Sequence, residues 1–283
     1  MNRRQFVKNS GLVAAAAALG LPDFSAKKVG NFGIQLYTLR DIIGKDPKGV
    51  LQQLAAFGYK EIESYSGQQG IFWGMSNKEF KSYLDSIGMK MVSSHYDWKN
   101  DTEKLAPQAA EIGMKYLICP YLGKQKTMDD YKRTADEFNK AGEICKKNGI
   151  RFVYHNHGYS FEDAVNGLYP QDAMMQGTDP ALVDFEMDIY WVATAGQDPE
   201  AWLKKYPNRW KLVHVKDRGK NFPAGQADAS VDLGTGMLDF SKILKTARKT
   251  GVKHYIVEQE RYDNTTSIKC AESNAAYMKK LSI

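Results

Sequence analysis

The sequence predicts an α/β protein folded as a single (β/α)₈ barrel, and three observations support this prediction. Apolar runs rich in Val, Ile, Tyr and Phe alternate eight times with segments of helical period. Five glycines stand where a helix is expected to end, one or two residues ahead of the next strand. Residues 27–283 have the usual length of such a barrel, about 250 residues.

The elements follow one another in a regular order. The expected strands are Phe32–Leu39, Tyr59–Tyr65, Met89–Tyr96, Lys115–Pro120, Arg151–His157, Leu182–Asp188, Trp210–Lys216 and His254–Gln259. The expected helices are Pro47–Phe57, Asn77–Ser86, Leu105–Glu111, Met128–Asn148, a broken one at Tyr169–Met175, Pro199–Lys205, Phe240–Lys249 and Thr266–Leu281. Glycine ends five helices because it adopts the left-handed cap conformation without a Cβ clash, at Gly58, Gly88, Gly113, Gly149 and Gly251.

The main alternative fold is an open, doubly wound sheet. No Gly-x-Gly-x-x-Gly follows any expected strand, so a dinucleotide-binding fold would lack its phosphate loop. No repeat, low-complexity tract or linker divides residues 27–283, which predicts one domain. Three cysteines, Cys119, Cys145 and Cys270, are too few for a disulfide framework, and their surroundings indicate apolar packing.

Composition excludes several classes of protein. The chain is 43% hydrophobic and 25% charged, which is typical of a globular domain and excludes disorder or a multi-span membrane protein. The net charge of +6 is dispersed without a basic run, which argues against nucleic acid as a partner. A homo-oligomer is compatible with this composition.

The first 26 residues have the pattern of an export signal. Arg3 and Arg4 precede a short apolar run, Leu12–Leu21, and small residues follow at Ser25-Ala26. This string resembles a twin-arginine signal, which predicts a periplasmic protein whose mature chain begins near Lys27. The apolar run is too short to span a bilayer, so no membrane span is expected after processing. The alternative interpretation is the N-terminal helix of a cytoplasmic enzyme.

Export can be tested directly. A reporter fused after residue 26 should leave the cytoplasm, and replacing Arg3→Lys together with Arg4→Lys should block its export because the twin-arginine route reads the arginine pair. The measurement is the reporter's distribution between periplasm and cytoplasm. Export that is unaffected by the double replacement would exclude this route.

Histidines and carboxylates gather at the expected strand ends. Active sites of (β/α)₈ barrels lie at the C-terminal ends of the strands. Four of the five histidines stand there, namely His95, His155, His157 and His214, whereas His254 opens the last strand. Imidazoles and carboxylates together predict one divalent metal, Mn²⁺, Zn²⁺ or Co²⁺. Each residue also has a simpler interpretation, because strand-end His and Asp often order loops or cap helices.

Six motifs taken in order resemble a known family. They are Gly33-Ile-Gln-Leu-Tyr-Thr-Leu-Arg40, Tyr154-His-Asn-His157, Asp188-Ile-Tyr-Trp191, Val213-His-Val-Lys-Asp217, Val257-Glu-Gln-Glu260 and the glycine-rich helix ends. Residues 29–283 thereby resemble the sugar phosphate isomerase/epimerase group of xylose isomerase-like barrels. The resemblance implies one metal held by Asp188, His214, Glu258 and the strand 5 position. The family's usual Glu is replaced there by His155, which removes one of the two carboxylates that the group's ketose 3-epimerases use as acid and base.

The two-residue period of a strand indicates which of the remaining candidates point into the barrel together. His155 and His157 share one phase, as do Glu258 and Glu260, and as do His214 and Lys216. We therefore expect Glu260, His157 and Lys216 to be catalytic. Glu186 has the phase of Asp188 and is a rival ligand. The expected substrate-binding residues are Gln35, Tyr37, Glu63, His95, Trp98 and Trp191, with the two tryptophans either stacking on a sugar or packing at the rim.

The reaction class follows from this chemistry. A metal beside a carbonyl lowers the cost of removing the neighbouring proton, and a carboxylate or imidazole takes that proton. The first hypothesis is an isomerase or epimerase of an unphosphorylated sugar, and the alternative is a 3-keto-glycoside lyase or hydratase. A sugar-binding protein without turnover and an endonuclease IV-like enzyme are further options. The latter needs three metals and a basic groove, which the sequence does not offer.

Overall fold

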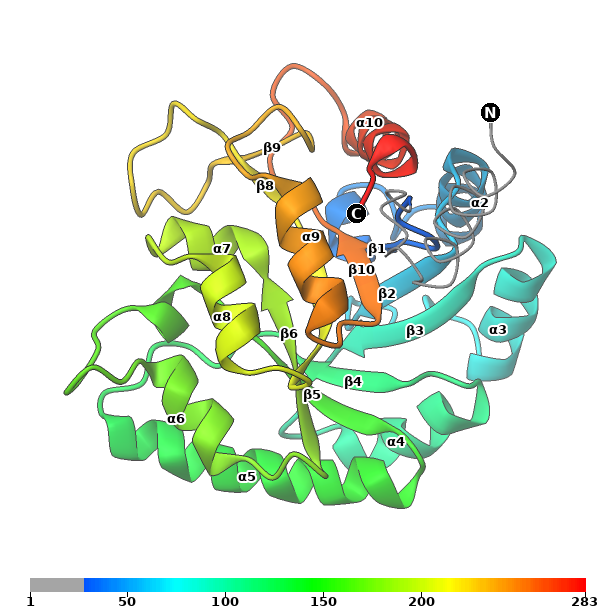
Figure 1. Ribbon diagram of the computed structural model, residues 1–283. Helices are drawn as coiled ribbons and strands as arrows, with labels where there is room; N and C mark the ends of the chain where they lie inside the picture. Colours follow the sequence, from blue (N-terminus) through cyan, green and yellow to red (C-terminus); the bar gives the residue numbers. More distant parts are fainter. Residues whose placement is uncertain (1–27) are drawn as a thin grey trace, which may run out of the picture.

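Eight parallel strands close into a barrel in the computed structural model, which describes residues 28–283 (Figure 1). Their order around the barrel is β1-β10-β7-β6-β5-β4-β3-β2. The strands are β1 (Gly33–Gln35), β2 (Glu61–Tyr65), β3 (Lys90–His95), β4 (Tyr116–Cys119), β5 (Arg151–His155), β6 (Val183–Asp188), β7 (Trp210–Val215) and β10 (His254–Val257). The predicted closed barrel is therefore confirmed. The proposed signal, residues 1–26, lies outside the described residues.

Helices surround the barrel and connect its strands (Figure 1). They are α2 (Pro47–Phe57), α3 (Asn77–Ser86), α4 (Thr102–Glu111), α5 (Met128–Lys147), α6 (Pro170–Gly177), α7 (Ile189–Thr194), α8 (Pro199–Lys205), α9 (Phe240–Lys249) and α10 (Ser267–Lys280). Four of them, α2, α3, α8 and α9, have the predicted bounds. Local signals set these bounds: Ser76 and Glu79 form a capping box at the start of α3, and Gly58 ends α2 at a φ of 106°.

Six of the eight barrel strands end earlier than predicted, whereas β2 and β6 end at the predicted residues. The predicted first strand continues to Leu39, but Leu36–Leu39 form a 3₁₀ turn, η1, because the Gln35 side chain accepts a hydrogen bond from the backbone N–H of Tyr37 at 3.0 Å. Likewise β5 ends at His155, and Gly158–Phe161 form a second 3₁₀ turn, η2.

Two elements after β6 and β7 were not predicted. Asp188 caps α7 directly after β6, with its Oδ1 accepting from the N–H of Trp191 at 3.1 Å. A small hairpin, β8 (Asp217–Arg218) with β9 (Ser230–Val231), follows β7. The carboxylate of Asp217 accepts backbone N–H groups from Gly234 and Gly236 at 2.9 and 3.0 Å. Asp217 therefore orders the loop beside the mouth of the barrel.

The barrel interior is layered. An apolar layer fills its middle and consists of Val92, Tyr116, Ile118, Val153, Leu212 and Ile256. The next inward-facing residues along β2, β5, β7 and β10 are polar, namely Glu63, His155, His214 and Glu258, and all four are buried. The three cysteines are free and buried, as their surroundings predict. Within residues 28–283, no helix combines the length and apolar character needed to cross a bilayer.

Candidate active site

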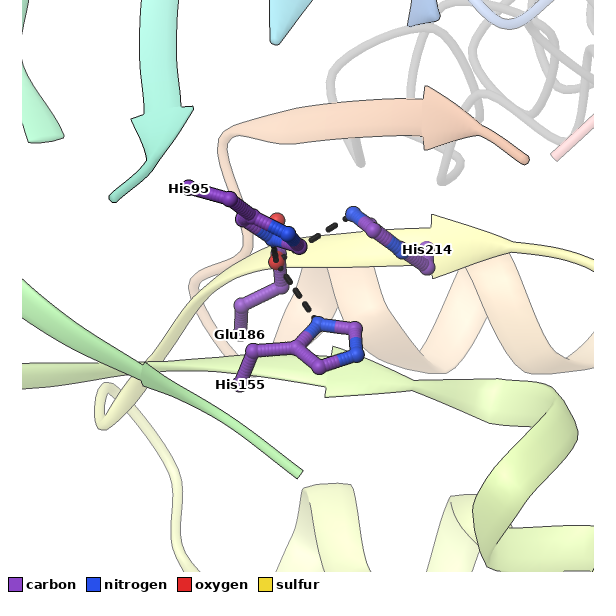
Figure 2. A group of neighbouring side chains, drawn as sticks. All are labelled: His95, His155, Glu186 and His214. Atoms are coloured by element: carbon purple, nitrogen blue, oxygen red, sulfur yellow. Dashed lines mark hydrogen bonds and ion pairs between the residues drawn. The ribbon is translucent and has the colours of Figure 1, made fainter. Parts of the chain in front are cut away.

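Three imidazoles surround one buried carboxylate at the C-terminal end of the barrel (Figure 2). Oε2 of Glu186 lies 3.2 Å from Nε2 of His95, 2.9 Å from Nδ1 of His155 and 3.2 Å from Nε2 of His214. The four residues come from β3, β5, β6 and β7. Residues 28 to 119 positions apart in the chain thus meet at one point, because parallel strands bring their C-terminal ends to the same face.

A second carboxylate, Glu63, lies at the same depth. It accepts hydrogen bonds from Nε2 of Gln35 at 2.7 Å and Oγ of Ser93 at 2.6 Å. Nε2 of His214 lies 2.6 Å from Oε1 of Glu63, and Nε2 of His95 lies 3.1 Å from the same oxygen. We call Glu63, His95 and Glu186 the inner layer. Gln35 therefore supports this layer from behind.

Four donor atoms converge one step nearer to the mouth. Nε2 of His155 and Nδ1 of His214 lie 3.8 and 3.9 Å from Oδ2 of Asp188, and Nδ1 of His214 lies 3.1 Å from Oε2 of Glu258. We call these four residues the outer layer. Oδ2 of Asp188 is buried and has no hydrogen-bond partner among the described residues. A buried carboxylate oxygen normally has a partner, so this atom, 4.0 Å from Nζ of Lys216, is available to bind a cation.

The outer layer fits a divalent metal. Two imidazole nitrogens and two carboxylate oxygens are a common donor set for zinc, whose ligand atoms lie about 3.3 Å apart when each bond is roughly 2.0–2.1 Å. Three of the distances between these donors are 3.1, 3.8 and 3.9 Å, and the donor atoms of Asp188, His214 and Glu258 all lie within 4.8 Å of one another. His155 contacts this group through Asp188 and would complete the set after a side-chain rotation. The same donors suit Mn²⁺ and Co²⁺.

The inner layer orients the two imidazoles of the outer layer. Nδ1 of His155 bonds Glu186 and Nε2 of His214 bonds Glu63, so each ring has its second nitrogen left for a metal. An ionised carboxylate only accepts, which places the imidazole hydrogens on those two nitrogens. Metal-binding histidines commonly donate their other N–H to a carboxylate in this way. The arrangement favours Asp188 over Glu186 as the β6 ligand.

This arrangement predicts the effect of Glu186→Gln. The variant should bind metal about 10–100-fold more weakly but not lose it, because His155 keeps its nitrogen and loses only the carboxylate behind it. Chelator competition with Zn²⁺ or Co²⁺ measures the affinity. The control is Glu61→Gln, which changes a buried glutamate paired with His254 on the last strand. Complete loss of metal would instead make Glu186 a ligand, and unchanged affinity would remove its orienting role.

Carboxylates crowd this end of the barrel. Burial raises the pKa of Glu186 to about 7, with a further increase from the negative charge of Glu63. Burial also raises the pKa of Asp188 to about 6. Burial alone would lower the pKa of His95, but Glu63 and Glu186 outweigh it and raise the value to about 9. A divalent cation would therefore compete with protons here and stabilise the ionised carboxylates.

Lys216 is a fixed cation beside the outer layer. Its side chain is 1% exposed, and its Nζ pairs with Glu260 and lies 3.3 Å from Oε2 of Glu258. Burial opposes its charge, yet the surrounding carboxylates raise the pKa of Lys216 well above its ordinary value. The ammonium also lies over the rings of Tyr190 and Trp191, 4.9 and 5.4 Å from their centroids. Lys216 thus holds Glu258 and Glu260 in place.

A cavity of about 490 Å³ opens above these layers. His95, His155 and Glu258 line its floor, with Glu260 and His157 beside them. The remaining lining is mostly aromatic and includes Tyr37, Tyr65, Tyr96, Tyr121 and Trp191. The cavity therefore joins the donor cluster to an open mouth, which is the arrangement that a small-molecule site requires.

His157 is the uncommitted imidazole of the cavity. It follows β5, and its ring stacks on Tyr159 at an interplanar angle of 2° and lies 5.2 Å from the Trp191 ring. Its Nδ1 is buried without a partner among residues 28–283. Burial and the charge of Lys216 lower the pKa of His157 to about 3, so the ring is neutral at physiological pH and only weakly basic.

Three predicted substrate-binding residues do not line the cavity: Gln35 and Glu63 are fully buried, and Trp98 lies elsewhere. Trp98, expected at the mouth, packs edge-on against Phe138 of α5 and Phe152 of β5, with ring centroids 4.9 and 6.3 Å away. The chain turns outward after β3, where Oδ1 and Oδ2 of Asp97 accept from residues 99 and 100. Rim packing, the alternative interpretation of this tryptophan, is the better description.

The sequence analysis missed several contributors, among them Tyr121 and Ser93. Tyr121 lines the cavity two residues beyond β4, whose end carries no histidine or carboxylate and was therefore passed over. Ser93 bonds Glu63 from within β3. The position of Tyr121 after a strand end was a signal that could have identified it.

Comparisons with known proteins agree with this geometry. Residues 51–281 match the sequence profile of the xylose isomerase-like TIM barrel family. The chain belongs to this family. The crystal structure of a sugar phosphate isomerase/epimerase from Parabacteroides distasonis is 30% identical, covers 91% of this chain and 95% of its own, and superposes with a TM-score of 0.74.

Two further relatives of this xylose isomerase-like barrel bear on its chemistry. Inosose dehydratase from Clostridium beijerinckii is 29% identical over 150 residues, which are 48% of this chain and 48% of the relative. The chain thus spans about half the length of the curated relatives it matches. The IOLI protein, whose crystal structure has a bound zinc atom, is 16% identical over 88% of this chain and 98% of its own, with a TM-score of 0.70. The last likeness concerns the fold alone.

Proposed function

We propose that this protein is a metal-dependent lyase that removes a proton next to a carbonyl of a sugar-like substrate and expels the oxygen substituent one carbon further on. The observation that carries this proposal is His157, a neutral imidazole that lines the cavity beside the donor cluster and whose Nδ1 has no hydrogen-bond partner among residues 28–283. Inosose dehydratase, the relative described above, carries out a dehydration by name, which supports a lyase over the isomerase or epimerase that we ranked first.

His155, Asp188, His214 and Glu258 would hold the metal, with Zn²⁺, Mn²⁺ and Co²⁺ as the candidates. A metal bound there supplies a Lewis acid, which makes a C–H group next to a carbonyl more acidic. Glu63 and Glu186 keep the two imidazoles in the required tautomers, and Lys216 holds Glu258 in position.

His157 then accepts the proton. Its ring lines the same cavity as Glu258 and is neutral, although its pKa of about 3 makes it a weak base for this step. The proton gained by His157 is available to the departing oxygen on the same face of the cavity, so one group serves both steps. Glu260 is the alternative acceptor, but it pairs with the buried ammonium of Lys216, and protonating Glu260 would weaken that pair.

Epimerisation is the second candidate function, favoured by the Parabacteroides distasonis relative. It needs a second group that delivers a proton to the opposite face of the substrate. His155 stands where the related epimerases have a carboxylate, and it bonds Glu186. Elimination, which needs one proton acceptor, therefore suits the cavity better.

Proton NMR in D₂O distinguishes these reactions. The protein, loaded with Mn²⁺, Zn²⁺ or Co²⁺, is incubated with 3-keto-glycosides, an inosose and free sugars. A lyase yields an unsaturated ketone and a free alcohol or water, and an epimerase yields an isomer that carries deuterium at the inverted carbon. Products of inversion without elimination would overturn the proposal, and so would the absence of any reaction across the panel.

The replaced carboxylate gives a separate prediction. His155→Glu should retain metal but lower the native activity by at least about tenfold, or roughly 1.4 kcal/mol of transition-state stabilisation. The new carboxylate would face Glu186 in a buried setting, because Nδ1 of His155 now lies 2.9 Å from that residue. Metal content and kcat/KM of the variant measure the effect. An unchanged rate would favour epimerisation instead.

A further inference from the structure

We infer that the aromatic outer half of the cavity is a subsite for a ring-shaped leaving group, either an aryl ring or a second pyranose. That the bound ring departs in the reaction rests on the proposed lyase function, whereas the binding of a ring is inferred from the cavity alone. The inference assigns glycosides, rather than free monosaccharides or cyclitols, as the substrate class.

The cavity has two chemically different ends. Its floor is charged and hydrogen-bonding, with His95, His155 and Glu258. Its mouth carries Tyr37 and Tyr121, whose side chains are 39% and 61% exposed. Among the described residues, five large hydrophobic side chains are exposed, and the two aromatic ones both line this cavity. Exposed aromatic rings that share a cavity mark a binding surface.

These rings are held rather than loose. Tyr121 meets His157 and Tyr159 edge-on, at interplanar angles of 88° and 89°. Tyr37 meets Tyr65 edge-on at 82°, and the guanidinium of Arg40 covers one of its sides, 4.7 Å from the ring centroid. Each tyrosine is thus oriented before a ligand arrives, which lowers the entropic cost of stacking a ring on it.

The cavity is larger than one sugar ring. Its volume of about 490 Å³ equals that of about sixteen waters at roughly 30 Å³ each. A hexose has twelve non-hydrogen atoms, each smaller than a water because bonded atoms overlap, so space remains for a second ring. The apolar layer closes the barrel below the charged floor of the cavity. If the substrate carbonyl binds at this floor, the rest of the substrate therefore extends toward Tyr37 and Tyr121.

Glycosides without a keto group test the subsite independently of turnover. Methyl β-glucoside, phenyl β-glucoside and cellobiose are titrated into the metal-loaded protein, with affinities from calorimetry and contacts from saturation-transfer NMR. We expect phenyl β-glucoside, cellobiose or both to bind about fivefold more tightly than the methyl compound, with saturation reaching the second ring. The tighter of the two identifies an aryl or a sugar leaving group.

Variants locate the effect. Tyr121→Ala should abolish the difference between the glycosides, Tyr121→Phe should keep it, and Met237→Ala, which removes an exposed side chain that does not line the cavity, should leave it unchanged. Equal affinities for all three glycosides, or a difference that survives Tyr121→Ala, would overturn the subsite. If ring binding depends on Tyr121 but no 3-keto-glycoside is converted, the subsite stands and the lyase proposal falls. If instead 3-keto-glycosides are converted with the same kcat/KM whatever their leaving group, the lyase proposal stands and the subsite falls.

Discussion

Asp188→Asn is expected to abolish metal binding and to lower turnover by at least about 10³-fold, or roughly 4 kcal/mol. Oδ2 of Asp188 is buried without a hydrogen-bond partner among residues 28–283, and the nearest nitrogens of His155 and His214 lie 3.8 and 3.9 Å from it. An amide there brings no negative charge and directs N–H groups at the ion. The replacement keeps Oδ1, which caps α7 through Trp191, so the local fold should persist.

Elemental analysis of the purified variant and its rate on the substrate identified by NMR measure the two effects. Asp184→Asn is the matched control, since Asp184 lies on the same strand in the same phase but pairs with Arg151 at the opposite end. His214→Ala should likewise contain no metal. A metal-free protein with undiminished activity would contradict the proposed metal dependence.

His157→Ala is expected to lower kcat by about 10²–10⁴-fold while metal content stays at the wild-type level. The variant loses the neutral ring that lines the cavity, yet the donor atoms of the outer layer keep their contacts. Added imidazole should restore part of the rate, because the ring would fill the space beside Tyr159 and Trp191.

Deuterium exchange next to the substrate carbonyl should stop in this variant, which a purely structural role would not require. Glu260→Gln is the comparison, and it should lose less activity than His157→Ala because Glu260 already pairs with Lys216. The reverse order of the two losses would make Glu260 the proton acceptor.

The secondary structure was largely accessible from sequence because its signals are local. The capping box of Ser76 with Glu79 and the glycines that end the helices act within one turn of chain. Inward and outward directions were accessible as well, since alternate residues of a strand face opposite sides. This period brought His155 with His157, and Glu258 with Glu260, to the cavity as predicted.

Positions after the strand ends were less accessible. Trp98 follows β3 by three residues, beyond the reach of the strand period, and the turn at Asp97 directs it outward onto α5. Tyr121 was overlooked because it too lies beyond a strand end. There the turn after β4 brings the side chain to the mouth of the cavity. Loop directions depend on packing against distant elements, which a local pattern does not record.

The sequence by itself determined the barrel, the end at which its polar groups gather, and the residue types available for a metal. Depth along the barrel was decided only by the tertiary structure. Register shifts occur between Ile62 and Glu63 and between Phe185 and Glu186, and both inner carboxylates follow such a shift. The two-residue period of a strand determines whether a residue faces into or out of the barrel. The stagger between neighbouring strands sets the position of that residue along the barrel axis. That stagger brings Glu63 within 2.6 Å of His214, across 151 residues of chain, and leaves Asp188 at the height of the outer layer.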